Sequence, residues 1–377
     1  MEPKRVLCGI DRIADADDLL RGKRIALLTA ASGINKQGIP TYRVLAERYL
    51  LRVIFAPEHG LFTNLQDGRF DDDREETDPE TGVPVCNLGT DGNPHMDAYL
   101  GQCDIAVYDI QDVGARFYTY LSNLTQLMRG CVRAGIPLLV LDRPNPIGGS
   151  DMEGAILDEG RFSSFIGEFA VPTRYALTVG EYAAYVNREK KIGCELHVLP
   201  CIGWSRGDYY DETDLLFVNP SPNIPSVGTV FNYLGGCIWE ATNISEGRGT
   251  TRPFDLVGAP FVDDAALWEE MRDLRLPGVI FRRCFFTPQF NKHAGQICRG
   301  LQLHVTDRHT YRPVLTMLYL FRHMKRYEAF TCRESGLCLR FGTDLLLSDF
   351  DPAEFDAQNA QTLAEFEKSV QSYRLYE

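Results

Sequence analysis

The stretch RIALLTAASGINKQGIPTYRVLAERYLLRVIFAPEHG, residues 24–60, decides the expected fold of this chain. It opens with a mostly apolar run at 24–29, continues with an amphipathic segment at 39–50, and closes with a second apolar run at 51–56. Two short apolar runs on either side of a helical pattern are typical of a β-α-β unit with parallel strands. Because both runs are nearly continuous in apolar residues, we expect a sheet that is covered on both faces.

The same alternation continues to about residue 200 and predicts an α/β fold with a Rossmann-like parallel sheet. Further strands are expected at 82–88, 104–110, 137–142 and 195–200. The segment NPSPNIPS, residues 219–226, has three prolines, which a central strand or a helix interior does not tolerate. We expect this segment to be the boundary between two domains. We therefore expect a Rossmann-like catalytic domain at 1–225 and a smaller α+β domain at 226–377.

Net charge, apolar run length and cysteine spacing limit the partners that this chain can bind and the compartment in which we expect it. The net charge of −13 argues against a nucleic-acid partner, and no apolar stretch approaches the ~18 residues that a membrane span needs. The eleven cysteines show no CxxC pair and no zinc spacing, which favours reduced thiols. With no signal peptide in the first residues, the expected location is cytoplasmic, or extracytoplasmic if a leader was trimmed. The sequence does not indicate an oligomeric state.

Common cofactor and hydrolase motifs are missing from the sequence. No GxGxxG follows the first predicted strand, so we expect no dinucleotide cofactor despite the Rossmann-like pattern. The seven histidines form no HExxH motif, which argues against a metal, and no GxSxG elbow indicates a serine hydrolase. The sequence therefore predicts no cofactor and no metal.

Polar side chains gather after the predicted strands, where ligands bind in open α/β sheets. Those we expect at this edge are Ser32, Glu58, His59, Arg116, Tyr118, Asp142, Arg143 and Asn145. Two acids and two arginines at neighbouring strand ends predict a binding pocket. Two alternatives stay open here: an Asp142–Arg143 ion pair would only fix its loop, and Tyr118 could belong to the first turn of a helix.

Glu58 is the most interesting of these residues. Pro57 fixes its own φ and biases Ala56 to an extended backbone, and Gly60 permits a positive φ, so the carboxylate lies on a stiff, sharply turned segment. A catalytic acid needs such positioning. From this stretch alone, a carboxylate that merely caps the next helix is about equally supported.

The second domain offers one polar loop, SEGRGTT at 245–251, with Glu246 and Arg248. Its spacing is neither GxxxxGK[ST] nor GxGxxG, so a phosphate-binding loop is only weakly indicated.

Seven motifs in order give the chain a family resemblance. They are APEHG, TDPETGVPV, QDVGARFYTY, LDRPNPIGG, NPSPNIPS, SEGRGTTRPF and GLQLHVTDR. In this order they resemble the NamZ-type exo-β-N-acetylmuramidases, a glycosidase family long described only as a domain of unknown function, and the similarity spans nearly the whole chain. The resemblance implies an active site between a Rossmann-like domain and a smaller one. It also implies release of N-acetylmuramic acid from the non-reducing end of peptidoglycan fragments, with Glu58 as the catalytic carboxylate.

On this basis we expect Glu58 to act as general acid. The second group would be Asp142, Glu246 or the 2-acetamido oxygen of the substrate, and the sequence does not choose among them. Arg116, Arg143 and Arg248 are candidates for the lactyl carboxylate. Ser32, His59, Tyr118 and Asn145 are further expected substrate contacts.

One departure from the family is that Thr29 is followed by Ala30, Ala31 and Ser32, where the family usually has an Asn. This loss leaves open a second function, a muropeptide-binding or sensing protein that kept the fold without catalysis. A nucleotide-dependent enzyme is a third alternative, supported only by the Rossmann-like pattern.

Overall fold

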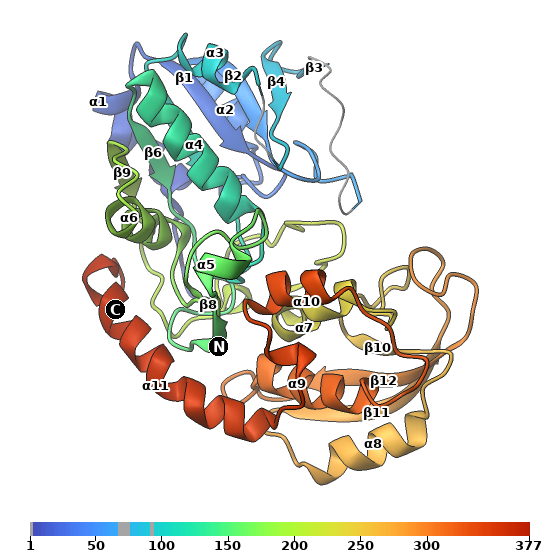
Figure 1. Cartoon of the computed structure of the whole chain (residues 1–377). Helices are drawn as coiled ribbons and strands as arrows, with labels where there is room; N and C mark the ends of the chain where they lie inside the picture. The colour runs from blue at the N-terminus through green and yellow to red at the C-terminus, as the bar shows by residue number, and fades with distance from the viewer. Residues whose placement is uncertain (1–2, 67–75, 91–93) are drawn as a thin grey trace.

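A computed structural model describes residues 3–66, 76–90 and 94–377 of the chain (Figure 1). Its main sheet has seven strands in the order β3-β4-β2-β1-β5-β6-β9, and all neighbours in it are parallel except β3 and β4. The strands are β1 (Arg24–Thr29), β2 (Leu50–Ala56), β3 (Glu76–Thr77), β4 (Pro84–Asn87), β5 (Ile105–Asp109), β6 (Leu138–Leu141) and β9 (Leu196–Leu199). The predicted α/β fold and its strands are confirmed, and the run 24–29 is β1 itself.

Both faces of this sheet are covered, which explains the continuous apolar strands. Leu28 belongs to one core with α4 (Tyr120–Ala134) and α6 (Val179–Glu189), whereas its neighbour Leu27 belongs to another core on the opposite face. The second face is covered by α1 (Asp17–Leu20), α2 (Thr41–Arg48) and the 3-10 helix η1 (Gly9–Ala16). A short helix, α3 (Met96–Leu100), packs against α4.

The second part of the chain is built on a three-stranded antiparallel sheet, β10-β12-β11. Its strands are β10 (Leu256–Ala259), β11 (Val279–Phe286) and β12 (Cys298–Val305). Helix α8 (Asp264–Asp273) packs on this sheet, and α7 (Val227–Gly236) packs against α9 (Pro313–Met324). The 3-10 helix η3 (Cys237–Ala241) and α10 (Glu334–Phe341) contact each other. The sequence analysis did not predict β10 or α10.

A small hairpin-like sheet and several short helices complete the described chain. Strand β7 (Glu153–Ile156) pairs antiparallel with β8 (Pro172–Arg174), and α5 (Glu159–Phe162) lies between them in sequence. The remaining 3-10 helices are η2 (Tyr210–Glu212), η4 (Leu345–Leu347) and η5 (Gln371–Tyr373). None of the described helices is long and apolar enough to cross a membrane.

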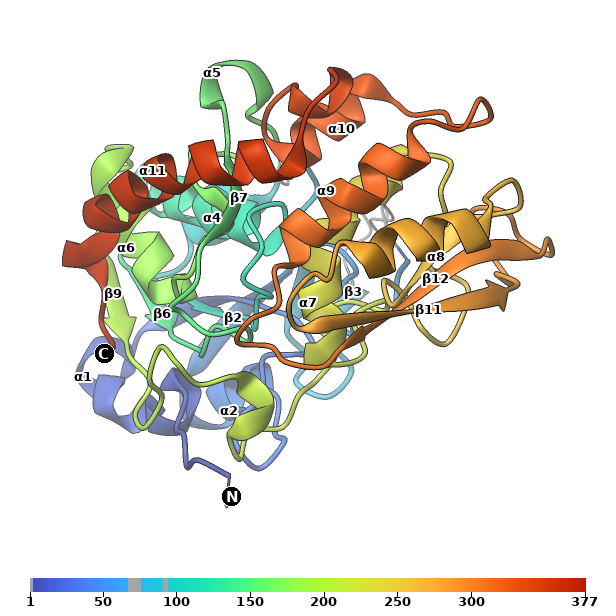
Figure 2. The ribbon, with the colours of Figure 1, turned by 90° about the horizontal axis from the view of Figure 1, so that it is seen from below.

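Helix α11 (Pro352–Val370) runs from the second part of the chain back to the first, as Figures 1 and 2 both show. Residues 366–377, which we term the C-terminal clasp, pack against α6 and the segment after β9. The Phe366 ring lies 5.7 Å from that of Tyr185, and the Tyr376 ring lies 5.0 Å from that of Trp204. The predicted second domain, 226–377, therefore contains a segment that packs on the first.

Candidate active site

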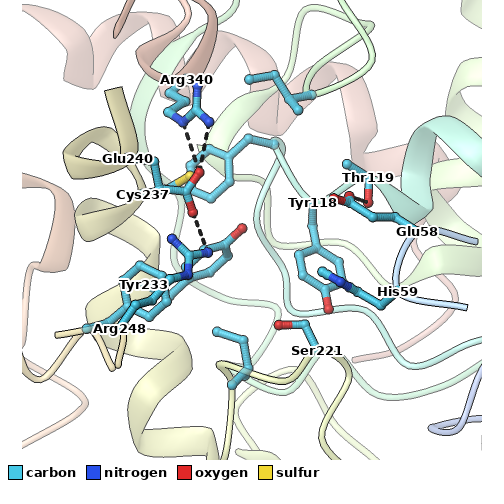
Figure 3. Close-up of a pocket in the computed structure, with 14 residues that line it drawn as sticks. Glu58, His59, Tyr118, Thr119, Ser221, Tyr233, Cys237, Glu240, Arg248 and Arg340 are labelled. Atoms are coloured by element: carbon cyan, nitrogen blue, oxygen red, sulfur yellow. Dashed lines mark hydrogen bonds and ion pairs between the residues drawn. The ribbon is translucent and has the colours of Figure 1, made fainter. Parts of the chain in front are cut away.

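One pocket is lined by side chains from both parts of the chain (Figure 3). It encloses about 520 Å³ of space not occupied by protein atoms, its mouth included. Glu58, His59, Tyr118, Thr119 and Ser221 line it from the N-terminal side of the sequence, and Tyr233, Cys237, Glu240, Arg248 and Arg340 from the C-terminal side. Figure 3 shows Glu58 and His59 on one side of the pocket, facing Glu240 and the two arginines on the other.

Glu58 lies in the turn that directly follows β2. Two consecutive residues after it, His59 and Gly60, have positive φ angles of 73° and 77°. This conformation is uncommon for a residue with a side chain, and it reverses the chain sharply. The His59 Nδ1 lies 2.9 Å from the Leu65 carbonyl oxygen, which can only accept, so Nδ1 carries the proton. The turn is thereby closed by its own side chain, and the carboxylate is held at the pocket.

Thr119, which also lines the pocket, fixes the orientation of the Glu58 carboxylate. Its hydroxyl donates to Glu58 Oε2 at 2.8 Å, and Thr119 immediately precedes α4, which is anchored in the main core. Glu58 is 8% exposed and His59 7%. A carboxylate that is nearly enclosed, opens to a pocket and is oriented by a hydroxyl has the setting that proton transfer to a bound substrate requires.

The opposite wall is an acid held between two arginines. Glu240 accepts from Arg248 Nη2 at 2.7 Å through Oε1 and from Arg340 Nη2 at 2.9 Å through Oε2. Burial raises the pKa of Glu240, but the charges of Arg248 and Arg340 outweigh it and lower the pKa to about 2. Glu240 is therefore ionised at neutral pH, and both its oxygens are engaged.

Behind this wall the ion pairs continue. Glu246 accepts from Arg248 Nη1 at 3.1 Å and from Lys292 Nζ at 2.7 Å. The cluster has three cations, Arg248, Lys292 and Arg340, and two acids, Glu240 and Glu246. Its formal sum, three minus two, is +1, in a chain whose net charge is −13. This wall therefore favours an anionic ligand group.

Two family models match this chain. The model of the N-terminal domain of exo-β-N-acetylmuramidase NamZ matches residues 25–228, and that of the NamZ C-terminal domain matches residues 231–376. The chain belongs to the NamZ family.

A curated NamZ relative and two solved structures resemble the chain. The peptidoglycan β-N-acetylmuramidase NamZ of Bacillus subtilis (strain 168) is 43% identical over 321 residues, which cover 84% of this chain and 77% of that protein. Two crystal structures of DUF1343 family proteins from Bacteroides fragilis NCTC 9343 superpose with TM-scores of 0.90 and 0.81, at 30% and 28% identity. Each superposition covers 99% of both chains.

Four of the predicted site residues of this NamZ family member line the pocket: Glu58, His59, Tyr118 and Arg248. The six others, Ser32, Arg116, Asp142, Arg143, Asn145 and Glu246, are not among its lining residues. Glu246 lies one layer behind Arg248, as described above.

Arg116 is buried beneath the pocket wall and does not line it. Its guanidinium donates to the carbonyl oxygen of Ala155 at 2.8 Å and to that of Arg340 at 2.7 Å. Burial lowers the pKa of Arg116 to about 10, so it stays charged at neutral pH. Arg116 thus holds the backbone near the end of α10, in the segment that carries Arg340.

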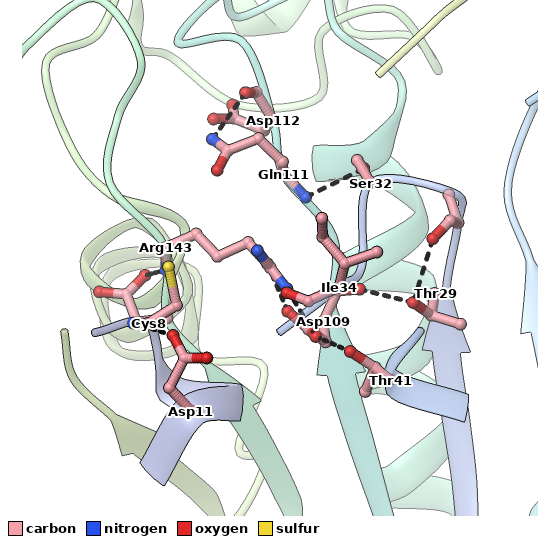
Figure 4. Close-up of polar contacts among 12 residues, drawn as sticks. Cys8, Asp11, Thr29, Ser32, Ile34, Thr41, Asp109, Gln111, Asp112 and Arg143 are labelled. Atoms are coloured by element: carbon pink, nitrogen blue, oxygen red, sulfur yellow. Dashed lines mark hydrogen bonds and ion pairs between the residues drawn. The ribbon is translucent and has the colours of Figure 1, made fainter. Parts of the chain in front are cut away.

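Arg143 and Ser32 belong to a second polar cluster, at the carboxyl ends of β1 and β5 (Figure 4). Arg143 is paired with Asp109 at the end of β5, at 2.5 Å, and also donates to the Ile34 carbonyl oxygen at 2.7 Å. Burial disfavours the charge of Arg143, but the Asp109 carboxylate raises its pKa. Ser32 accepts from the Gln111 backbone N–H at 3.3 Å. These buried side chains are engaged by Asp109 and by the backbone at the point where a dinucleotide would bind in a Rossmann fold.

Asn145 is also buried among structural partners. Its amide donates to the Leu177 carbonyl oxygen at 2.9 Å and its side-chain oxygen accepts from the Ile147 N–H at 3.2 Å. These two hydrogen bonds fix the loop formed by LDRPNPIGG.

Asp142 is fully buried at the end of β6 and is surrounded by donors. It accepts from the Thr178 hydroxyl at 2.7 Å, from the Gly180 N–H at 2.8 Å and from the Tyr376 hydroxyl of the C-terminal clasp. Burial raises the pKa of Asp142 to about 6, although these three donors lower it. The Asp142–Arg143 ion pair that was left open as an alternative does not form, because Arg143 pairs with Asp109.

Replacing Tyr376 by Phe is expected to destabilise the protein more at pH 8 than at pH 5. The folded pKa of Asp142, about 6, lies above its ordinary value of 3.8, so ionisation of the folded carboxyl costs stability as pH rises through this range. The hydroxyl offsets part of that cost and also accepts from the Cys201 N–H at 2.9 Å. Its loss should cost about 1–3 kcal/mol, most of it above pH 6.

Urea unfolding of Tyr376→Phe at the two pH values checks this. Tyr373→Phe is the matched control on the same clasp, because its hydroxyl bonds to the exposed Glu189. An equal loss at pH 5 and pH 8 would show that Asp142 does not carry the effect.

Several lining residues were not predicted from the sequence. Thr119 and Ser221 lie inside the motifs QDVGARFYTY and NPSPNIPS, and Thr119 directly follows Tyr118. Glu240 and Arg340 are 100 residues apart, on η3 and α10, and neither follows a predicted strand. Residues such as these cannot be identified by searching for polar side chains at the ends of predicted strands.

Proposed function

We propose that this chain is an exo-acting glycosidase that releases N-acetylmuramic acid from the non-reducing end of peptidoglycan fragments. The observation that carries the proposal is the pocket in which Glu58 faces a cationic wall. The muramyl sugar is distinguished from its neighbours in peptidoglycan by a lactyl carboxylate, and the net positive wall offers this anion a partner.

Glu58 is the general acid in this proposal. It would donate its proton to the glycosidic oxygen as the bond from that oxygen to the anomeric carbon breaks, so that the leaving sugar departs as a neutral alcohol. Thr119 keeps the carboxyl in one orientation while the proton moves. Water then adds to the anomeric carbon and returns a proton to Glu58.

The second group is the 2-acetamido oxygen of the substrate. Among the described lining residues, Glu240 is the other carboxylate, and Arg248 and Arg340 hold both its oxygens. Asp142 and Glu246 do not line the pocket, and hydrogen-bond donors already engage both of them. An internal acetamido oxygen that attacks the anomeric carbon supplies the charge stabilisation that the protein carboxylates described here do not, as in substrate-assisted glycosidases.

A substrate with a trifluoroacetamido group is therefore expected to react at least about tenfold more slowly than the acetamido substrate. Fluorine withdraws electrons from the amide oxygen and weakens it as an internal nucleophile. Comparing kcat/KM for the two chromogenic muramides measures the effect. Equal rates would assign the second role to a protein group or to water.

Arg248 and Arg340 are proposed to bind the lactyl carboxylate. Glu240 keeps the two guanidinium groups in place, and a guanidinium binds carboxylate with charge-assisted hydrogen bonds. This arrangement replaces the predicted use of Arg116 and Arg143, which are buried elsewhere.

Incubation with two disaccharides tests the function. Mass spectrometry should detect cleavage of muramyl-N-acetylglucosamine and none of N-acetylglucosaminyl-muramic acid. Thermal stabilisation by the first disaccharide without release of free sugar would instead indicate the muropeptide-binding protein. Cleavage of both disaccharides would contradict the specificity for a muramyl residue at the non-reducing end.

A further inference from the structure

The 2-acetamido group of the sugar has two ends, an oxygen and an N–H, and both change during the proposed reaction. The oxygen bonds to the anomeric carbon, and the amide nitrogen gains positive charge as that bond forms. The N–H is therefore a stronger hydrogen-bond donor in the transition state than in the ground state, and an acceptor placed beside it would accelerate the reaction. The inference drawn below rests on the proposed function, because it concerns the same sugar in the same pocket.

His59 offers such an acceptor at the pocket. Its Nδ1 carries the proton that is donated to the Leu65 carbonyl oxygen at 2.9 Å, so in the neutral ring Nε2 carries a lone pair. Nε2 makes no hydrogen bond within the described residues, and it is not one of the unpartnered polar atoms that the protein closes off from solvent. His59 lines the Glu58 pocket, and in Figure 3 its ring extends from the turn toward the pocket. Nε2 is therefore open to a ligand in this pocket.

The His59 ring is fixed before any substrate binds. Leu65 holds the residue at two points, because its N–H donates to the His59 carbonyl oxygen at 3.3 Å and its carbonyl oxygen accepts from Nδ1. The backbone of His59 is set at a φ of 73° by the turn, and the residue is 7% exposed. An acceptor fixed in this way needs little reorganisation when charge develops on the substrate.

His59 directly follows Glu58, and this order matches the sugar. The glycosidic oxygen and the acetamido nitrogen are bonded to neighbouring ring carbons, so the proton donor and the N–H acceptor have to lie side by side. Consecutive residues of a strand point to opposite faces, but the turn after β2 brings both side chains to one pocket. Glu240 lies on the other side of the pocket, and Arg248 and Arg340 engage both its oxygens.

We propose that His59 Nε2 accepts a hydrogen bond from the acetamido N–H and directs the acetamido oxygen to the anomeric carbon. As the glycosidic bond breaks, the Glu58 proton moves to the leaving oxygen and the acetamido oxygen bonds to the anomeric carbon. The cyclic oxazolinium ion that forms keeps its N–H on Nε2, where its positive charge strengthens the hydrogen bond. Water then attacks the anomeric carbon, opens the ring and returns a proton to Glu58. His59 thereby selects sugars that carry an acylamino group beside the anomeric carbon.

Two substitutions separate this role from closure of the turn. In His59→Asn the amide nitrogen takes the place of Nδ1 and still donates to Leu65, but no atom replaces Nε2. In His59→Gln the longer side chain brings an amide oxygen to the place of Nε2, and the hydrogen bond to Leu65 is lost. His59→Asn should lower kcat/KM on muramyl-N-acetylglucosamine by about 10–150-fold, the usual effect of losing a charge-assisted hydrogen bond. His59→Gln should keep at least about fivefold more activity than His59→Asn.

A substrate without the N–H gives a readout that a structural role would not change. A chromogenic muramide with an acetoxy group in place of the acetamido group keeps the carbonyl oxygen and lacks the N–H. His59→Asn should lower the ratio of kcat/KM for the acetamido substrate to that for the acetoxy substrate at least about tenfold relative to the wild type. The ratio does not depend on the fraction of folded protein, because both substrates are measured on one preparation. His304→Asn, the same change at an exposed histidine of β12, is the matched control and should leave the ratio unchanged.

The wild-type protein is assayed first, so that failure of the proposed function is recognised separately. If it releases no N-acetylmuramic acid from the disaccharide, the proposed function and the role of His59 both fail. If it does release the sugar, an unchanged substrate ratio in His59→Asn would overturn the role of Nε2 alone. Higher activity of His59→Asn than of His59→Gln would also overturn it, since closure of the turn would then be what His59 contributes.

Discussion

Replacing Glu58 by Gln is expected to lower kcat on muramyl-N-acetylglucosamine by about 10²–10⁴-fold, the usual contribution of a general acid. The amide cannot supply the proton, yet its oxygen can still accept from the Thr119 hydroxyl that now bonds to Glu58 at 2.8 Å. The free energy of unfolding should therefore change little. Steady-state release of N-acetylmuramic acid, measured beside urea unfolding, separates the catalytic effect from a folding defect.

The leaving group makes this prediction sharper. The dinitrophenolate of a 2,4-dinitrophenyl N-acetylmuramide leaves without being protonated. Glu58→Gln should therefore lose at least about tenfold less activity on this substrate than on the disaccharide. Glu195→Gln, on a glutamate whose side chain is 71% exposed, is the matched control and should behave as the wild type does. Equal losses on both substrates would show that Glu58 positions the sugar and does not protonate it.

Replacing Arg248 by Gln is expected to lower kcat/KM for an N-acetylmuramide by about 10–150-fold, which corresponds to the loss of one charge-assisted hydrogen bond of about 1.5–3 kcal/mol. Most of the effect should appear in KM, because the lactyl carboxylate is bound in both the ground state and the transition state. Kinetics with the chromogenic muramide measure the two constants. The change also leaves Glu240 with Arg340 and Glu246 with Lys292, so each acid keeps one partner.

Arg252→Gln is the matched control for this prediction. Arg252 lies on the same loop, but its side chain is 62% exposed and its pair with Asp255 is long, at 3.5 Å. It should alter kcat/KM less than about twofold, as expected of an exposed ion pair. If Arg248→Gln changed kcat alone, the arginine would act on the reacting bond and not on the lactyl group.

The sheet was predictable because each strand carries its own signal. Residues 25–28 are apolar on both faces because the cores around Leu27 and Leu28 cover both faces of the sheet. Hydrophobic burial stabilises such strands wherever they lie in the sequence. Short elements such as β10 and α10 lack a distinct apolar period, and their packing partners are distant in sequence. Pattern alone could not identify them.

The site was only partly predictable for a different reason. The carboxyl ends of parallel strands meet at one edge of a sheet, and ligands bind beyond that edge. This does not determine which of the residues at the strand ends face an open pocket. Arg143 and Asp142 follow β6 as expected, yet Asp109 and Thr178 engage them. Glu58 stays at the pocket because its turn reverses the chain there. The facing acid, Glu240, depends on how the second part of the chain docks.

The return of helix α11 has a mechanical consequence for the pocket. Two parts joined by a single connection can rotate apart about that connection. Here the chain passes between the two parts at residues 219–226 and again through α11. The C-terminal clasp holds the end of α11 on the first part. Two separate connections resist the rotation that would part Glu58 from Arg248 and Arg340. The substrate therefore binds to a pocket whose two walls are already in place. Little of the binding free energy is needed to close the protein around it.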